Sequence, residues 1–141
     1  MKTAAATLAL LGALLPAASA QQSVSVSYDE RYDVSGSSMN TVSCSDGANG
    51  LVTKYPTFGS VPNFPHIGGS PTIAGWNSAN CGKCYQLTYG SKSIYVTAID
   101  AAPGGFNIAL SAMNDLTGGQ AVNLGRVQAT YQEVAKSNCG Q

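Results

Sequence analysis

Residues 81–100, CGKCYQLTYGSKSIYVTAID, contain the strongest strand signal in the chain and two of its four cysteines. Apolar and polar side chains alternate over Tyr85–Tyr89, and Ser93–Ile99 form a second, more apolar run. Between the two runs, Gly90-Ser91-Lys92 is typical of a hairpin loop. The stretch therefore predicts a β-hairpin, and its second strand is apolar enough to be central in a sheet.

The N-terminus determines how the cysteines are interpreted. Lys2 is followed by an apolar stretch, residues 4–15, and then by Ala18-Ser19-Ala20, a small-residue cleavage pattern. This order is typical of a secretory signal peptide over residues 1–20, after which the mature protein would begin at Gln21. Since no other stretch is long and apolar enough to cross a bilayer, we expect a secreted protein without a transmembrane segment.

Four cysteines in an oxidising compartment are expected to form two disulfides. They are Cys44, Cys81, Cys84 and Cys139, for which sequence alone allows three pairings. A zinc site is disfavoured because the chain has a single histidine, His66, and the thiolates would pair before binding a metal. A redox-active CGKC motif would need a βαβ setting that the sequence lacks. We therefore expect structural disulfides, no metal and no other cofactor.

The composition points to one domain, residues 21–141, with a nearly neutral surface. Without Lys2 the chain carries six basic and seven acidic side chains, a net charge of −1. This balance gives no electrostatic reason to expect binding to nucleic acid or to an anionic membrane. Charged residues make up 10% of the chain, well below the roughly 25% of an average domain. Neutral polar side chains must therefore supply much of the surface, which suits neutral, hydroxyl-rich ligands.

Hydrophobic periodicity predicts the remaining elements. Apolar residues at 108, 109, 112, 113 and 116 share one face of a short helix, which Gly118-Gly119 would end. A Pro- and Gly-rich stretch, residues 56–75, predicts a long loop. Period-two alternation predicts further strands at 23–28, 51–55 and 127–132. These short strands indicate a mainly β protein, and a barrel is favoured because closure removes exposed edges.

Among the acidic residues, Asp100 stands out as a candidate for function. It ends the apolar run IYVTAID where the chain leaves the predicted sheet, a position suited to face a cleft. Alternatively, its carboxylate orients a loop by accepting hydrogen bonds from backbone N–H groups. Glycoside hydrolysis usually needs two carboxylates, and Asp46 is the remaining candidate for the second. A Ser-His-Asp triad is disfavoured because His66 lies among prolines and glycines.

Aromatic side chains are a second source of sugar contacts, because sugars stack on aromatic faces. Tyr85, Tyr95 and Tyr131 lie in strand patterns, where aromatic residues contribute to the core. Trp76, the single tryptophan, is close to Cys81 and is interpreted as a cover over a disulfide. Tyr55 ends a predicted strand next to a loop and is the better candidate for an exposed ring.

Six motifs, taken together, resemble the cerato-platanin family of small secreted fungal proteins. They occur in the family's order and cover nearly the whole mature chain, including all four cysteines. The motifs are SYDERYD (27–33), CSDGANGL (44–51), FPHIGG (64–69), GWNSANCGKCY (75–85), IYVTAID (94–100) and GFNIALSAM (105–113).

The resemblance implies a fold and an activity. The implied fold is a mainly β, six-stranded double-psi β-barrel with short helices, in which disulfides pair Cys44 with Cys81 and Cys84 with Cys139. The implied activity is non-catalytic: binding of chitin fragments and expansin-like loosening of polysaccharide. Family members also act as elicitors of plant defence, virulence factors, allergens and proteins that self-assemble at interfaces, which implies a plant surface receptor as a further partner.

The resemblance also implies where sugars bind. Asp100 and Asn107 match polar positions of a shallow groove, and Asp46, Asn49 and Tyr55 are weaker candidates for the same face. The expected partners are N-acetylglucosamine oligomers and cellulose. A groove with one carboxylate can bind sugar hydroxyls but cannot carry out hydrolysis with two carboxylates.

Two alternative functions remain. The first is a weak endoglucanase-like hydrolase that uses Asp100 with Asp46, which would release new reducing ends. The second is a surface-active structural protein of the cell wall that assembles through exposed apolar patches.

Overall fold

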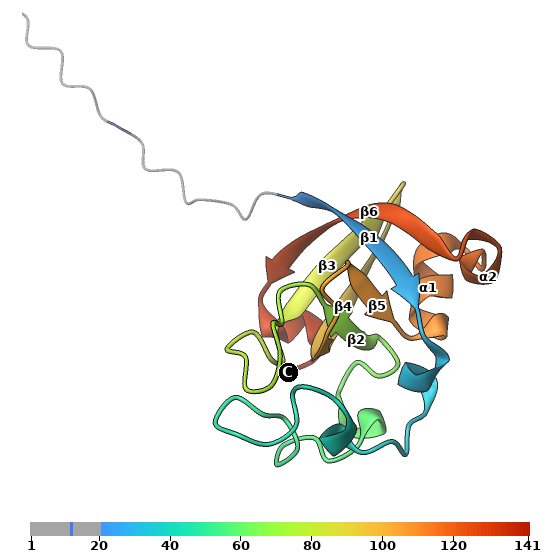
Figure 1. Cartoon of the computed structure of the whole chain (residues 1–141). Coiled ribbons are helices and arrows are strands. Elements are labelled where there is room, and N and C mark those ends of the chain that lie inside the picture. Colours follow the sequence, from blue (N-terminus) through green and yellow to red (C-terminus); the bar gives the residue numbers. More distant parts are fainter. Residues whose placement is uncertain (1–11, 13–20) are drawn as a thin grey trace, which may run out of the picture.

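Six strands form a closed β-barrel in the structure, a computed structural model that describes Gly12 and residues 21–141 (Figure 1). Apart from Gly12, the predicted signal peptide lies outside the described residues. In chain order the strands are β1 (Gln22–Tyr28), β2 (Ile67–Ser70), β3 (Cys84–Tyr89), β4 (Lys92–Ala101), β5 (Phe106–Ile108) and β6 (Arg126–Val134). The expected fold class is confirmed.

The order of the strands around the barrel differs from their order in the chain. It runs β1-β5-β2-β4-β3-β6 and closes with β6 next to β1. The pairs β1–β5 and β2–β4 are parallel, and the other pairs are antiparallel. Strands that are far apart in the sequence therefore become neighbours in the barrel wall.

The strongest periodic signals are confirmed. The predicted hairpin is β3 and β4, and the strands predicted at 23–28 and 127–132 are β1 and β6. The predicted helix is α1 (Leu110–Thr117), whose C-cap Gly118 adopts a left-handed conformation with φ of 65°. It begins later than the apolar pattern does, because Phe106–Ile108 form β5.

The strand predicted at residues 51–55 is wrong. These residues form turns, and the backbone N–H groups of Leu51 and Val52 donate to the carbonyls of Cys44 and Ser45. The backbone N–H of Tyr55 donates back to the carbonyl of Leu51. A short apolar run can satisfy its backbone groups in a compact loop as well as in a sheet, and here the loop folds onto the core.

Strand β2 lies in the stretch that the sequence predicts to be a loop. The sequence gives no strand signal here, because two of the four residues of β2 are glycines and glycine is rare in strands. At Gly68 a Cβ atom would collide with the backbone oxygen of Asn107. The glycine thus allows β2 to approach β5 closely, and the barrel closes at this point.

The core fills the barrel and extends under the helices. Tyr85, Phe106 and Tyr131 make edge-to-face contacts inside the barrel, with ring centroids 5.2 to 6.0 Å apart. Next to α1 lies a second helix, α2 (Ala121–Leu124), and residues 29–66 form a long loop layer below the barrel in Figure 1. Within residues 21–141 the fold also contains four short 3-10 helices: η1 (Glu30–Asp33), η2 (Met39–Thr41), η3 (Phe58–Ser60) and η4 (Lys136–Cys139). No helix in the described part of the chain is long and apolar enough to cross a membrane.

Two disulfides connect the loops to the barrel. Cys44 pairs with Cys81, and Cys84 on β3 pairs with Cys139 in η4. The pairing implied by the resemblance is confirmed. The first bond joins the loop layer to the turn before β3, and the second ties the C-terminal segment to the barrel.

Candidate functional site

The strand register brings residues from five strands into one row across the barrel, which we call the polar row. Gly69 on β2 is paired with Asp100 on β4 and with Asn107 on β5. Asn107 is paired in turn with Ser27 on β1, and Ser27 with Arg126 on β6. The polar row follows the curved wall of the closed barrel over four strand spacings, about 19 Å measured along the wall. The fold thus places Asp100 and Asn107 on either side of Gly69.

The alternation of side chains explains why much of the polar row faces outward. Each exposed member of the row adjoins an apolar residue in the sequence. These apolar residues are Val26, Phe106 and Val127, and all three are buried in the core. Because successive side chains of a strand point to opposite faces, Ser27, Asn107 and Arg126 point away from it. Ser27 and Asn107 are partly exposed and Arg126 is exposed.

A hollow of about 300 Å³ lies at one end of the polar row, lined by Ser27, Asn107, Arg126 and residues 102–105. The hydroxyl of Ser27 donates to Oδ1 of Asn107 at 3.1 Å. The Nδ2 group of Asn107 has no acceptor among the described residues. Nη1 of Arg126 donates to Oγ of Ser25 at 2.9 Å, and no carboxylate of the described residues lies within 4.0 Å of its guanidinium. The hollow thus offers an amide, a hydroxyl and a cation to a ligand.

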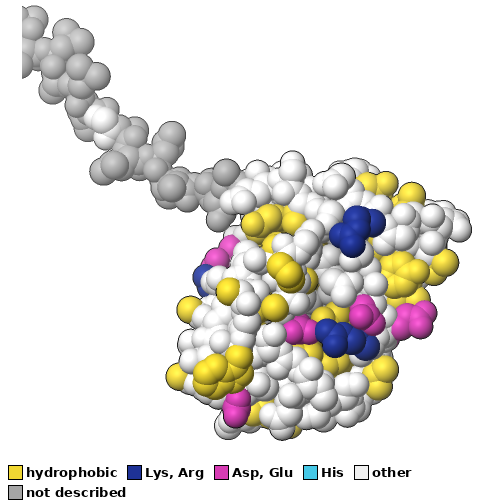
Figure 2. Space-filling view, viewed as in Figure 1, with side chains coloured by type: hydrophobic (Ala, Val, Ile, Leu, Met, Phe, Trp, Pro, Cys, Tyr) yellow, Lys and Arg dark blue, Asp and Glu magenta, His cyan; other side chains and the backbone are white. Residues whose placement is uncertain are grey.

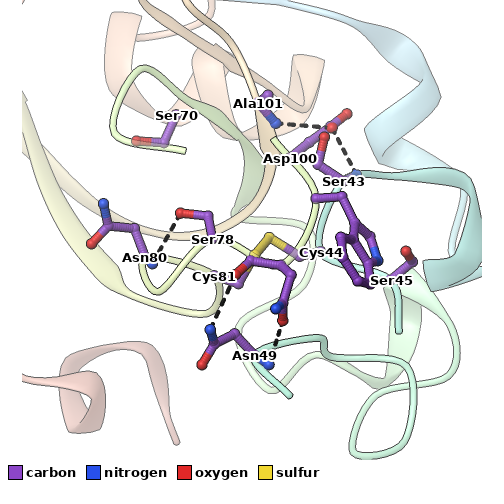
Figure 3. Close-up of a disulfide and its surroundings, with 12 residues drawn as sticks. Ser43, Cys44, Ser45, Asn49, Ser70, Ser78, Asn80, Cys81, Asp100 and Ala101 are labelled. Carbon is purple, nitrogen blue, oxygen red and sulfur yellow. Dashed lines mark hydrogen bonds between the residues drawn. A yellow bond between two sulfur atoms is a disulfide. The ribbon is translucent and has the colours of Figure 1, made fainter. Parts of the chain in front are cut away.

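Asp100 occupies the other end of the polar row and is only 7% exposed. Its Oδ2 accepts hydrogen bonds from Nη2 of Arg31 at 2.5 Å and from the hydroxyl of Tyr32 at 2.8 Å. Its Oδ1 accepts from the backbone N–H groups of Ser43 at 3.0 Å and Ala101 at 2.9 Å (Figure 3). These donors occupy the four acceptor positions of a carboxylate. Asp100 therefore orients a loop, as one of the two interpretations of the sequence proposed.

Burial and charge around Asp100 shift the pKa values of its partners. Burial raises the pKa of Tyr32 strongly; the hydrogen bond from Arg31 opposes this shift, and the charge of Asp100 adds to it. Burial acts to lower the pKa of Arg31, but the hydrogen bond to Tyr32 and the charges of Asp100 and Asp29 raise it overall. Tyr32 is therefore neutral and Arg31 charged at ordinary pH. The side chain of Arg31 is about half exposed and presents this charge at the surface.

Asp46 and Asn49 lie apart from the polar row, in a cluster with Trp76 and Asn77. Nε1 of Trp76 donates to Oδ1 of Asp46 at 2.7 Å, and the backbone N–H of Asn49 donates to Oδ1 of Asn77 at 2.9 Å. The interpretation of Trp76 as a cover over a disulfide is wrong, since the residue is 62% exposed. Trp76 lies in a turn outside the strands, with its indole N–H bonded to Asp46.

Tyr55 differs from expectation in the opposite direction. It is only 7% exposed and belongs to the hydrophobic core. The expectation of an exposed ring is therefore wrong. The reason is the turn at residues 51–55, which directs the ring inward, while Nζ of Lys54 lies 5.3 Å from the ring centroid.

The acidic groups in this region are engaged by hydrogen-bond donors. Asp29 and Asp100 share Arg31, with 3.5 Å between Oδ2 of Asp29 and Nε of Arg31. The described residues contain no group of three or more His, Cys, Asp or Glu side chains that could hold a metal ion. The geometry is suited to hydrogen bonding of a polar ligand.

Comparison with known proteins places the chain in a family. Residues 24–141 match the family model of cerato-platanin. The chain belongs to the cerato-platanin family. It is 73% identical over 116 residues to Allergen Asp f 15 of Aspergillus fumigatus, covering 82% of this chain and 76% of that protein. It is 42% identical over 128 residues to Cerato-platanin of Ceratocystis fimbriata f. sp. platani, covering 89% and 93% respectively.

Solved structures of cerato-platanin family members share the fold. Cerato-platanin 2 from M. perniciosa superposes with a TM-score of 0.83 and 50% identity, covering 85% of this chain and 100% of that one. The solution structure of the fungal elicitor Cerato-Platanin gives a TM-score of 0.76 and 44% identity, covering 82% of this chain and 96% of that one. These and other cerato-platanin relatives are named as an elicitor, as allergens and as antigens, and not as enzymes.

Sequence reasoning missed several residues of this cerato-platanin surface. Ser27 and Arg126 join Asn107 only because β1 lies between β5 and β6, and the sequence does not indicate that neighbourhood. Alternation within each strand does mark both as outward-facing, but it cannot say what they face. The exposure of Trp76 could have been predicted from the sequence around it, because GWNSAN has few apolar residues that could cover an indole.

Proposed function

We propose that this protein binds polysaccharides without hydrolysing them and that its ligands, N-acetylglucosamine oligomers in the first place, bind at the exposed part of the polar row. The polar row itself is the observation that carries the proposal. Asn107, Ser27 and Arg126 offer donors and acceptors that suit sugar hydroxyls. Gly69 is itself buried against Ala102, so the accessible part of the polar row is the end that borders the hollow.

The character of the surface supports a neutral, hydroxyl-rich ligand. Charged residues are only 10% of the chain, and most atoms on the face in Figure 2 belong to neutral polar side chains or to the backbone. Hydrogen bonds to such groups do not require a charged ligand. An open hollow buries little of an oligosaccharide, so we expect weak binding.

The other candidate residues have distinct parts in this proposal. Asp100 holds Arg31 and the backbone of Ser43 at one end of the polar row and contributes to sugar binding by positioning them. Asp46 and Asn49 belong to the neighbouring cluster with Trp76. Tyr55 lies beneath the surface and supports the loop of residues 44–55 from inside.

The proposal that the protein is not an enzyme follows from the state of its carboxylates. Two-carboxylate hydrolysis needs one acid that protonates the leaving oxygen and another that attacks or activates water. Asp100 would have to give up several hydrogen bonds before it could do either. Oδ1 of Asp46, its expected partner, already accepts from Trp76.

The biological role is proposed from the disulfides and the relatives. Two disulfides fit an extracellular protein, which supports secretion. A solved relative is titled a fungal elicitor, and the relative from Aspergillus fumigatus is named an allergen. We propose that this protein is likewise secreted and acts outside the cell. There it loosens wall polysaccharide in the manner of expansins, and it elicits plant defence through a surface receptor.

Titration of residues 21–141, with both disulfides formed, tests the binding proposal. N-acetylglucosamine tetramers and cello-oligomers are added in parallel, amide shifts are followed by NMR, and new reducing ends are assayed in the same samples. We expect saturable shifts at Asn107 and Ser27 and no new reducing ends. Asn107→Ala should weaken binding about fivefold to tenfold, the loss of one or two hydrogen bonds.

Asn138→Ala is the matched control, since Asn138 is an exposed asparagine whose side chain bonds only within its own turn. Equal binding by the Asn107 and Asn138 variants would show that the polar row is not the site. New reducing ends would favour the hydrolase. If neither shifts nor reducing ends are seen, the surface-active structural protein becomes the better explanation.

A further inference from the structure

Trp76 is the most exposed aromatic residue of the described chain and has no part in the polar row. It is 62% exposed, and the chain has no other tryptophan. It lies in an irregular turn between β2 and β3. A large apolar ring in water is costly, so its exposure calls for an explanation.

The ring of Trp76 is held in one orientation. Nε1 donates to Oδ1 of Asp46 at 2.7 Å. A Cβ atom on Gly47 would come within 3.0 Å of Cζ2, so one side of the indole lies against the backbone of Gly47. Gly47 itself adopts a φ of 86°, a conformation that side chains rarely allow. The ring is thus held at its N–H and near Cζ2, while 62% of the residue stays exposed to solvent.

The two loops that carry this cluster are fastened to each other. Asn77, at a φ of 60°, accepts from the backbone N–H of Asn49 at 2.9 Å, and Nδ2 of Asn49 donates to its carbonyl at 3.1 Å. Both bonds are drawn at Asn49 in Figure 3, next to the disulfide between Cys44 and Cys81. A surface fastened in this way loses little entropy when a ligand binds.

The rim of the ring indicates the ligand. Polar residues lie beside the indole: Asp46 accepts from its N–H, and Asn77, the next residue in the chain, is hydrogen-bonded to Asn49. A protein-binding hot spot is usually an aromatic residue in a wider, water-excluding apolar patch. The other exposed large apolar side chains of the described residues belong to segments distant in sequence: Val34, Tyr95, Val122 and Leu124. A pyranose in a β-linked chain has an apolar C–H face with hydroxyls at its edge. This pattern complements a single aromatic ring with a polar rim.

We propose that Trp76 is a stacking platform for one sugar ring of a β-linked polysaccharide, with Asp46 as the residue that positions the indole. The inference rests on the proposed function and adds an aromatic subsite to the polar row. The backbone N–H of Cys44 donates to the carbonyl of Ile99 at 3.1 Å, and that of Ser43 to Asp100. The loop that carries Asp46 therefore adjoins the Asp100 end of the row, where the side chain of Arg31 is half exposed.

The single tryptophan allows a direct test, because all indole fluorescence comes from Trp76. We expect N-acetylglucosamine tetramer and cellotetraose to cause a saturable blue shift and to protect the ring from acrylamide quenching. Trp76→Ala should bind about tenfold more weakly by NMR titration, the loss of one stacking contact. Tyr95→Ala, which removes an exposed aromatic from the outside of β4, is the matched control and should bind normally.

A second pair of variants tests the positioning role of Asp46. Asp46→Ala removes the acceptor of the indole N–H and should weaken binding by a factor smaller than Trp76→Ala does. Asp46→Asn keeps an acceptor and should restore most of the affinity. Equal effects of Asp46→Ala and Asp46→Asn on binding would show that the carboxylate does not act through the ring.

The outcomes separate this inference from the proposed function. Shifts at Asn107 with unchanged tryptophan fluorescence would overturn the stacking platform and leave the polar row intact. A fluorescence change without shifts at Asn107 would support the platform and overturn the polar row as the site. If the wild-type protein shows neither signal with either oligosaccharide, both proposals are wrong.

Discussion

Asp100 positions neighbouring groups through hydrogen bonds that leave its carboxylate fully occupied. Its carboxylate binds a half-exposed arginine, a buried tyrosine hydroxyl and two backbone N–H groups. Donors to a buried carboxylate each stabilise the charge, and together they make the group an anchor for the residues around it. Substitution of Asp100 would therefore alter the positions of Arg31 and Ser43 as well as remove a charge.

Tyr32 predicts how stability depends on pH. Because its pKa is raised above the ordinary value of 10.0, the unfolded chain loses this proton before the folded chain does. Its contribution to stability is complete below about pH 10 and is lost as the pH rises towards the higher pKa of the folded state. We expect the free energy of unfolding, measured by urea denaturation, to fall above pH 10 and to fall less steeply in Tyr32→Phe.

Tyr95→Phe is the control for this pH dependence, since Tyr95 is exposed. Tyr85, whose pKa is also raised by burial, accounts for part of the remaining slope. Identical slopes for the wild type and Tyr32→Phe would mean that Tyr32 ionises equally in the folded and unfolded chains.

At the scale of elements, helix α1 depends on a residue far from it in the sequence. Its N-cap position, Ala109, has no side chain that can accept a hydrogen bond. Asp33, at the end of η1, supplies the acceptors instead, with Oδ2 2.7 Å from the backbone N of Leu110 and Oδ1 3.0 Å from that of Ser111. The motif SYDERYD thus joins the first strand to the helix that covers the barrel.

Asp33→Ala should lower the free energy of unfolding by about 1–2 kcal/mol, because the N-terminal N–H groups of α1 lose their acceptor and a favourable negative charge. Asp33→Asn retains an acceptor oxygen and should lose less. Urea denaturation of both variants measures the difference. An unchanged midpoint for Asp33→Ala would show that water caps the helix equally well.

At the scale of the whole molecule, the chain is held together by closure and by cross-links. The barrel leaves no free edge strand, and the disulfide between Cys84 and Cys139 ties the last residues to β3 across 55 positions. The other disulfide spans 37 positions and joins the loops that carry Asp46 and Trp76. The Cys84–Cys139 disulfide therefore contributes to global stability, and the Cys44–Cys81 disulfide also shapes the candidate sugar-binding surface.

Replacing Cys84 and Cys139 together by serine should lower the free energy of unfolding by about 4 kcal/mol, the loop entropy that a cross-link of this span removes from the unfolded chain. Guanidinium denaturation measures this loss. Sugar binding by the folded fraction should stay unchanged. A loss below about 1 kcal/mol would show that β6 and its neighbours already hold the C-terminal segment without help.

The sequence by itself determined the class of fold and its strongest elements. Alternation in β1, β3, β4 and β6 and the apolar face of α1 are local patterns, and local patterns follow from which side chains one element must bury. The four cysteines predicted two disulfides, and the near-zero net charge gave no reason to expect binding to nucleic acid or to an anionic membrane. The family resemblance added the disulfide pairing and directed attention to Asp100 and Asn107.

Tertiary structure alone decided what these residues meet. Gly68 lets β2 pair with β5, and this pairing sets Asn107 opposite Gly69 and in line with Ser27 and Arg126. The same long-range packing buries Tyr55 and leaves Trp76 exposed, against both expectations from the sequence. Burial and strand register depend on partners that are distant in the chain, and no periodicity within one segment carries that information.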